Sequence, residues 1–175
     1  MKKLFLFLVV CVFYHAACAQ NSVTDYLGTW KGECGDTIFT IKLLEGDIRY
    51  NGTIVKILGG YSVMVNEEII DNYLDVGTTL PLGVNAVDYK VYINASYFIP
   101  PRQYVGFTFC DQRKKHFNGE GILGGKLEYI APNQLHWTLD EKYGIWCETE
   151  GDEDAEEVQP IGFSVPTDII LTKVE

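Results

Sequence analysis

The sequence predicts an all-β protein, a small antiparallel up-and-down β-barrel of about eight to ten strands. Three observations lead to this prediction. Runs of β-branched and aromatic residues dominate the chain after residue 20, short turn signals separate the runs, and no apolar stripe with the period of an α-helix reaches helical length. Closing the sheet into a barrel also removes exposed strand edges. An open β-sandwich is the alternative all-β fold.

In the first half of the chain, the first expected strand begins at residues 28–30. The run over 36–44 alternates in part between apolar and polar residues, the run over 47–58 is rich in β-branched residues, and the run over 61–65 places three large apolar residues on one face. Glycine-centred turns are expected at residues 34–36, 45–47 and 58–60. The residues expected to share the core face are Phe39, Ile41 and Leu43 in one run and Tyr61, Val63 and Val65 in another.

After these runs, residues 65–74 allow either a helical turn or a hairpin at residues 66–68. The strand expected over 88–99 carries Val91, Ile93 and four aromatic residues, and a further strand follows the breaker Pro100-Pro101. The Ala-Pro-Asn turn at residues 131–133 separates two later strands. The remaining strands are expected over residues 104–109, 125–130, 135–139 and 168–174.

The composition is that of one folded globular domain. Of the 175 residues, 47% are hydrophobic and 22% are charged, which excludes a disordered or fibrous chain. The formal net charge of -10 argues against nucleic-acid binding, because a protein that contacts phosphates needs a basic face.

The first 19 residues are expected to be a cleaved signal peptide, which leaves residues 20–175 as a single barrel domain. Lys2 and Lys3 precede an apolar run over residues 4–14, and residues 17–19 supply the small residues that signal peptidase reads. The apolar run is too short to span a bilayer, which needs about 20 such residues. We therefore expect an exported protein, periplasmic or extracellular, without a transmembrane helix.

A lipoprotein is the alternative at the same place. Residues 15–18 resemble a bacterial lipobox, in which Cys18 would be lipidated and become the first residue. His15 stands where the lipobox has an aliphatic residue, so soluble export is favoured. Cleavage after residue 19 leaves 156 of the 175 residues, and the loss of Lys2 and Lys3 takes the formal charge from -10 to -12.

Two segments resemble known families. Gly28-Thr29-Trp30 resembles the Gly-x-Trp of the lipocalin and calycin superfamily, in which a tryptophan near the start of strand one plugs the closed end of the barrel. This resemblance implies structural roles for Gly28 and Trp30. Trp137 is the third expected structural residue: strand alternation places it and His136 on opposite faces, so that a buried Trp137 leaves His136 facing solvent.

A longer resemblance covers both ends of the mature chain. Residues 26–30, 39–43, 135–139 and 163–173 look like a family of small secreted proteins of the Bacteroides and Flavobacterium group, recorded as a domain of unknown function, number 6705. The family implies a lipocalin-like β-barrel but brings no activity and no catalytic residues.

Three cysteines remain after cleavage, Cys34, Cys110 and Cys147. In an exported chain they allow one disulfide and one remaining thiol, with the pairing left open. Their spacing matches no zinc motif, so no metal site is predicted.

Other motifs are interpreted as structural. Residues 119–124 spell G-x-G-x-x-G, but a strand follows where a dinucleotide site needs a helix, and no cofactor is predicted. The acidic run over residues 148–157 lacks the order of a calcium loop and is interpreted as a solvated loop. The basic cluster at residues 113–116 is interpreted as a hairpin tip.

Three functions remain open. The first is binding of a small apolar ligand in the barrel, the usual use of a barrel of this size. The second is a structural or interaction protein of the cell envelope, with a packed barrel and no ligand. The third, and the least favoured, is a hydrolase with dispersed carboxylates, since no spacing marks a catalytic set. No catalytic residue is predicted, and oligomeric state is left open.

Overall fold

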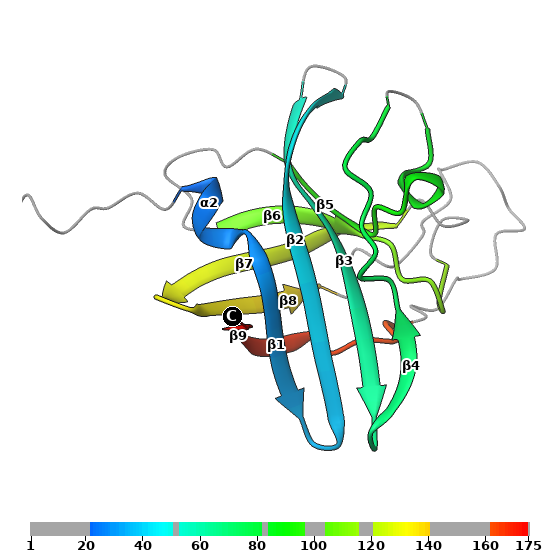
Figure 1. Cartoon of the computed structure of the whole chain (residues 1–175), viewed down its shortest axis with the longest axis vertical. Helices are drawn as coiled ribbons and strands as arrows, with labels where there is room; N and C mark the ends of the chain where they lie inside the picture. Colours follow the sequence, from blue (N-terminus) through cyan, green and yellow to red (C-terminus); the bar gives the residue numbers. More distant parts are fainter. Residues whose placement is uncertain are drawn as a thin grey trace, which may run out of the picture.

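In the described part of the computed structural model, nine antiparallel strands form one sheet, and eight of them close into a barrel (Figure 1). The prediction of an all-β up-and-down barrel is therefore confirmed. The described residues are 22–50, 53–81, 84–96, 104–115, 121–140 and 162–174. The strands are β1 (Gly28–Cys34), β2 (Thr37–Tyr50), β3 (Thr53–Val65), β4 (Glu68–Asn72), β5 (Ile93–Ser96), β6 (Tyr104–Phe109), β7 (Ile122–Ala131), β8 (Gln134–Leu139) and β9 (Asp168–Val174).

The barrel closes between its first and last strands. Its order is β1-β2-β3-β5-β6-β7-β8-β9, and β9 pairs with β1 through Thr29 to Lys31. Strand β4 stands outside this ring and pairs with the last residues of β3, while β5 pairs with the earlier part of the same strand. The closed ring excludes the open sandwich.

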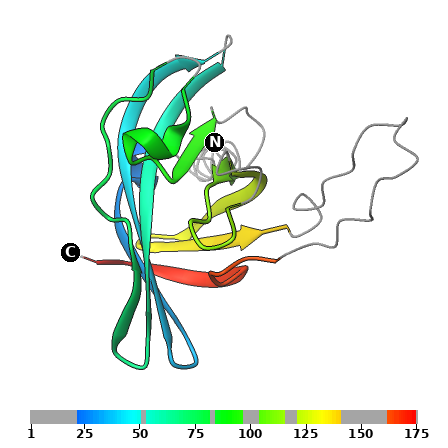
Figure 2. The same ribbon diagram turned by 90° about the vertical axis from the view of Figure 1, so that its right-hand side faces the viewer.

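The two halves of the sheet cross each other. Strands β1, β2 and β3 run across β7, β8 and β9, as the two perpendicular views show (Figures 1 and 2). Where β9 passes β1, a Cβ on Gly32 would lie 2.8 Å from the carbonyl oxygen of Ile170. Glycine at this position therefore allows the close approach that turns the corner of the barrel.

Two of the expected turns are wrong. Strand β2 continues through residues 45–47, where the pairing with β3 shifts at a bulge, and β3 continues through residues 58–60. The glycines there provide room instead of a turn, since a Cβ on Gly60 would lie 1.9 Å from the carbonyl oxygen of Tyr73. The hairpin connection falls between Tyr50 and Thr53, at an Asn-Gly pair outside the described residues.

The hairpin expected at residues 66–68 is confirmed, and the helical alternative is wrong. Asn66 and Glu67 connect β3 to β4 with φ angles of 49° and 68°. Positive φ at both central residues is the type I′ turn, whose twist matches that of the two strands.

Replacing Glu67 with glycine should raise the free energy of unfolding by about 0.5–1 kcal/mol, because glycine adopts a positive φ without steric cost. Urea denaturation followed by circular dichroism measures the change. Glu68→Gly is the matched control: it places the glycine one residue later, inside β4, and should lower stability by a similar amount. Equal effects of the two substitutions would contradict the assignment of the turn.

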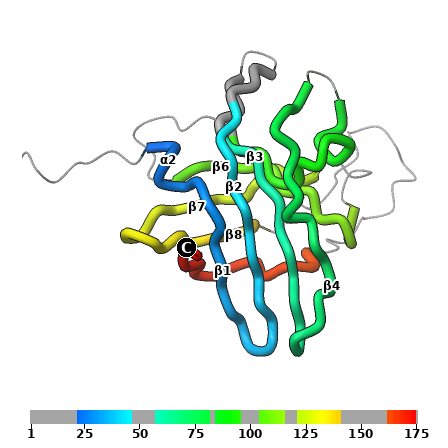
Figure 3. The backbone as a smooth tube through the Cα atoms, viewed as in Figure 1, coloured from blue at the N-terminus to red at the C-terminus, as the bar shows by residue number. Residues whose placement is uncertain are grey.

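The segment between β4 and β5 covers the outer face of β3. Leu58 points outward there and packs with Val76, Leu80 and Val91 in a second, smaller core. The segment contains a short 3-10 helix, η1 (Ala86–Tyr89), so the strand expected over residues 88–99 is wrong at its start and begins only at Ile93. Figure 3 shows the backbone of this cover beside β3.

The remaining strand predictions agree with the structure. β6 and β9 have the predicted bounds, β7 and β8 differ from prediction by at most three residues, and a turn at Pro132 and Asn133 separates them. A short helix, α2 (Val23–Tyr26), precedes β1 and begins with a capping box at Ser22 and Asp25. The expected signal peptide, residues 1–19 with Cys18, lies outside the described residues.

Candidate functional site

The middle of the barrel is filled by aromatic rings. Trp137 on β8 contacts Phe39 on β2 at a centroid distance of 5.1 Å, and Phe107 and Phe109 on β6 at 4.4 and 5.4 Å. All four side chains are fully buried. Because β2 and β8 are not neighbours in the sheet, the contact between Phe39 and Trp137 joins opposite walls. Gly125 on β7 leaves the room that the Phe107 ring occupies.

Three tyrosines form the next layer, towards one end of the barrel. Tyr61 on β3 packs on Phe109 at 5.0 Å, and on its other side contacts Tyr73 at 5.2 Å and Tyr92 at 6.2 Å. Tyr73 and Tyr92 contact each other at 4.8 Å. Tyr61 and Tyr92 are buried, whereas Tyr73 is partly exposed. The aromatic interior therefore reaches the surface at Tyr73.

Burial raises the pKa of all three tyrosines above the ordinary value. At Tyr61 the largest cause is loss of solvent, which a hydrogen bond from the backbone N–H of Gln112 partly offsets. The negative charges of Asp71 and Asp111 raise the pKa of Tyr61 and Tyr73 further. The tyrosines are thus neutral and lie in a negative field.

Asp111 is a buried carboxylate whose charge acts on this tyrosine layer. It is 1% exposed, and both of its carboxylate oxygens accept hydrogen bonds. Oδ1 accepts from the backbone N–H groups of Arg113 and Lys114, each at 3.0 Å, and from Oγ of Ser164 at 2.7 Å. Oδ2 accepts from the backbone N–H of Ser164 at 2.6 Å. This carboxylate joins the segment after β6 to the segment before β9.

Asp71 on β4 has a different environment. It is 7% exposed, and its Oδ2 makes no hydrogen bond within the described part of the chain. The Nε atom of Arg113 lies 4.0 Å from that oxygen. Burial raises the pKa of Asp71, the charge of Arg113 lowers it, and that of Asp111 raises it, with a net increase. We call Tyr61, Asp71, Tyr73, Tyr92 and Asp111 the acidic tyrosine cluster.

Replacing Asp71 with asparagine should raise the free energy of unfolding at neutral pH by on the order of 1 kcal/mol, because a neutral amide is less costly to bury than a carboxylate. The raised pKa in the folded state means that the folded protein binds the proton more tightly than the unfolded chain, whose carboxyl titrates near 3.9. The contribution of Asp71 to stability is therefore complete below the unfolded pKa and is lost as the pH rises through the folded pKa.

Urea denaturation across a pH series measures this effect. The difference in stability between Asp71→Asn and the wild type should be smallest in acid and should grow as the pH rises. Asp168→Asn is the matched control, since Asp168 is exposed on the outer surface. A variant less stable than the wild type at neutral pH would contradict the assignment.

The predicted structural residues lie away from this cluster or beneath it. Trp137 is in the central ring layer. Trp30 is fully buried near α2, where its Nε1–H donates to the carbonyl oxygen of Tyr26 at 2.8 Å. The Lys173 ammonium lies 5.1 Å from the Trp30 ring centroid. Gly28 has a φ of 120° and is covered by the Lys173 side chain. The structural roles remain predictions that substitution would test.

The cysteines are not brought together within the described residues. Cys34 is a free thiol exposed at the end of β1. Cys110 is buried, and burial raises the pKa of its thiol to about 12. Cys147 lies outside the described residues, so the predicted disulfide stays a prediction.

His136 lies on the outer surface, opposite to the buried Trp137, as strand alternation predicts. Its Nε2 lies 2.8 Å from Oδ1 of Asp168, and its Nδ1 lies 3.4 Å from Oε2 of Glu128. These three side chains come from the neighbouring strands β9, β8 and β7 and join them across the outer face. Surface pairs of this kind contribute little to stability.

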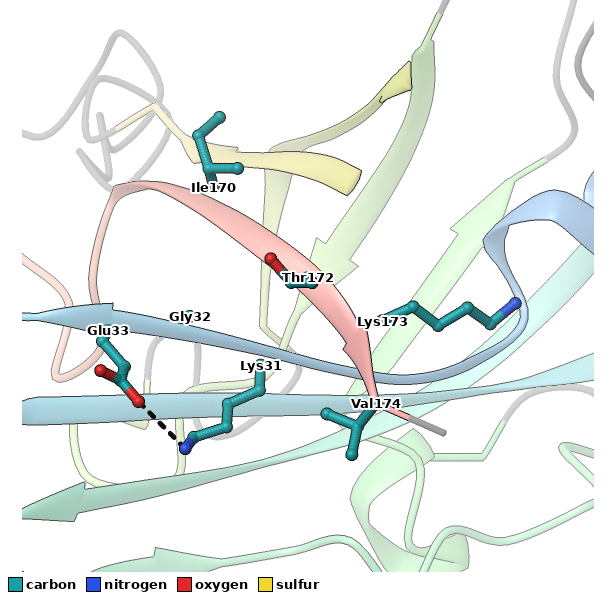
Figure 4. Close-up of a pocket in the computed structure, with 7 residues that line it drawn as sticks. All are labelled: Lys31, Gly32, Glu33, Ile170, Thr172, Lys173 and Val174. Carbon is teal, nitrogen blue, oxygen red and sulfur yellow. Dashed lines mark ion pairs between the residues drawn. The ribbon is translucent and has the colours of Figure 1, made fainter. Parts of the chain in front are cut away.

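Two open hollows of the described surface also lie outside the barrel. One, of about 560 Å³, follows the crossing of β1 and β9. Figure 4 shows its residues, with the Lys31–Glu33 ion pair on one side and Ile170 and Thr172 on the other. The second, of about 600 Å³, lies beside Lys126, Thr138 and Asp168. Neither hollow reaches the acidic tyrosine cluster.

Sequence reasoning missed Asp71, Tyr73 and Asp111. An Asx-turn signal was present at Asp111, since aspartate before Gln112 and Arg113 favours a turn in which its side chain accepts backbone hydrogen bonds. No local signal marks Asp71, whose burial depends on the pairing of β4 with β3.

No group of three or more His, Cys, Asp or Glu side chains among the described residues is arranged to hold a metal ion. No helix in the same part of the chain has the length and apolar character needed to cross a membrane. Asp71 and Asp111 are the buried carboxylates of the cluster, but Asp111 uses both oxygens for structural hydrogen bonds.

A family model described as a family of unknown function, DUF6705, matches residues 1–174. No curated protein and no solved structure matches the chain.

Proposed function

The chain belongs to this family of unknown function, and from that premise we propose that it is an exported, lipocalin-like barrel that binds a small, largely apolar ligand. The ligand is held at the end of the barrel that the acidic tyrosine cluster lines. Ligand sites are typically apolar and aromatic, with a few polar groups that fix orientation. The observation that carries the proposal is the layer of three tyrosines, which continues the aromatic interior to the surface at Tyr73.

The position at the end of the barrel follows from the packing of its middle. Trp137 contacts each of the three phenylalanines and joins opposite walls, so a ligand at that level would have to displace these rings. The tyrosine layer is different because one of its rings is partly solvated. Tyrosine suits such a position, since it offers an apolar ring and a polar hydroxyl.

Native mass spectrometry of the protein purified from its own host tests the proposal. A retained small molecule should appear as added mass and should be lost in Tyr73→Ala. Tyr89→Ala is the matched control, because Tyr89 is a partly exposed tyrosine of η1 outside the cluster, and this variant should keep the added mass. A protein without added mass under conditions that preserve complexes would contradict ligand binding.

The same spectra test export. A mature chain that begins with pyroglutamate at residue 20 supports cleavage of the signal peptide over residues 1–19. A lipidated Cys18 as the first residue would instead support anchoring as a lipoprotein.

A second candidate function is an interaction protein of the cell envelope whose barrel holds no ligand. The contact between Phe39 and Trp137 across the barrel favours this function. A barrel filled in this way would act through contacts of its outer surface with a partner. Exposed apolar side chains on that surface include Ile130, Ile170 and Val174. The absence of added mass in the native spectra would favour this function over the first.

A further inference from the structure

Asp71 has a buried acceptor oxygen that the described residues leave without a donor. Its side chain is 6% exposed, yet Oδ2 makes no hydrogen bond among the described residues. The Nε atom of Arg113, at 4.0 Å, is beyond hydrogen-bond distance. A carboxylate oxygen buried without a donor is costly. Asp111, close by, shows the contrast, because its two oxygens accept four hydrogen bonds.

The surroundings of Asp71 favour a cation. The charges of Asp71 and Asp111 both raise the pKa of Tyr73, so the negative potential of both carboxylates extends to the Tyr73 side chain. Tyrosine ring faces attract cations through their quadrupole, most strongly where water is excluded. Arg113 is the facing positive charge, while Lys90 is paired with Asp75 on the surface.

The positive side chain next to this buried oxygen, Arg113, lies partly in solvent. The Arg113 side chain is 52% exposed, so it can move aside further into solvent. Tyr73 is also partly exposed. A ligand that enters beside these two residues meets the tyrosine layer with one part and the carboxylate with another.

We propose that the acidic tyrosine cluster binds a small organic ammonium cation, whose N–H groups donate to Oδ2 of Asp71 and whose hydrocarbon part lies against Tyr73 and Tyr92. The inference rests on the proposed ligand-binding function and names the class of ligand. The ammonium group takes the place of Arg113 and supplies the donor that the described residues do not offer to Oδ2 of Asp71. A neutral apolar ligand at the same place would leave the buried oxygen unpaired.

Two probes of nearly equal size and shape test the charge requirement. 2-Phenylethylammonium carries the cation, and 2-phenylethanol replaces it with a hydroxyl group. Isothermal titration calorimetry on the full mature chain, above neutral pH where Asp71 is more fully ionised, compares their affinities. The ammonium compound should bind at least tenfold more tightly than the alcohol.

Three variants locate the site. Asp71→Asn should weaken binding of 2-phenylethylammonium at least tenfold, although we expect this variant to be the more stable protein, so that unfolding does not explain the loss. Asp168→Asn removes the same charge from the outer surface and should leave the affinity unchanged. Arg113→Gln removes the competing cation and should strengthen binding severalfold.

The outcomes separate this inference from the proposed function. Equal affinities for the two probes, or an Asp71→Asn variant that binds the cation as well as the wild type, would overturn ammonium recognition. If the native spectra nevertheless show a retained neutral ligand that depends on Tyr73, the ligand-binding function stands and only its class is wrong. If neither probe binds and no ligand is retained, both are overturned.

Discussion

Replacing Asp111 with alanine should lower the free energy of unfolding by about 3–5 kcal/mol. The carboxylate is 1% exposed and accepts four hydrogen bonds. Its removal leaves the backbone N–H groups of Arg113, Lys114 and Ser164 without their acceptor. Hydrogen bonds to a charged group are the strong ones, and a buried donor left without an acceptor is costly. Urea denaturation followed by tryptophan fluorescence measures the loss.

Two controls define what Asp111 contributes. Asp111→Asn keeps one carbonyl oxygen but presents an N–H group where Oδ2 or Oδ1 accepted, so we expect a smaller loss than for alanine. Asp168→Asn should change stability by less than about 1 kcal/mol, because its carboxylate lies on the surface. A loss below about 1 kcal/mol in Asp111→Ala would show that the two segments are held together by other contacts.

Replacing Trp137 with alanine should cost about 3–5 kcal/mol, the usual loss for a buried tryptophan. The ring contacts Phe39, Phe107 and Phe109, and its Nε1–H donates to the carbonyl oxygen of Pro166 at 3.0 Å. Truncation removes these contacts and opens a cavity between opposite walls of the barrel. Chemical denaturation and near-ultraviolet circular dichroism together measure the loss of stability and of fixed aromatic packing.

Ile170→Ala is the control for Trp137→Ala. Ile170 is 45% exposed on the outer face of the same part of the sheet, so its truncation should cost no more than about 0.5–1 kcal/mol. A Trp137→Ala variant as stable as this control would mean that the middle of the barrel is not filled by ring contacts. In that case the middle of the barrel would be a candidate ligand cavity.

The burial of Trp137 can be predicted from the sequence, whereas the hydrogen bonding of Asp111 cannot. Alternation in the β8 segment already placed Trp137 opposite His136, and the structure has Trp137 buried and His136 on the outer surface. Asp111 follows a strand in a polar segment, where the same pattern predicts only a turn. Its partner Ser164 is 53 residues away in the chain, and no local pattern relates the two.

The two structural roles of glycine explain why some predicted turns are confirmed and others are wrong. The sequence pattern predicts a turn at Gly59-Gly60, but β3 passes through this pair, and the absence of side chains there allows the close approach of Leu43 and Tyr73. The turn between β3 and β4 uses Asn66 and Glu67, with no glycine. Glycine marks both turns and close contacts, and only the neighbouring chain decides between them.

The sequence by itself determined the all-β class, most of the strands and the faces they bury, because side-chain alternation along a strand is a local property. Only the tertiary structure decided where the barrel closes, that aromatic rings fill its middle, and that Asp71 lies buried near Tyr61 and Tyr73 with one oxygen that the described residues leave unpaired. Those features depend on which strands become neighbours and how they cross. Desolvation and hydrogen bonding act between residues far apart in the chain, so no local pattern could place the candidate site.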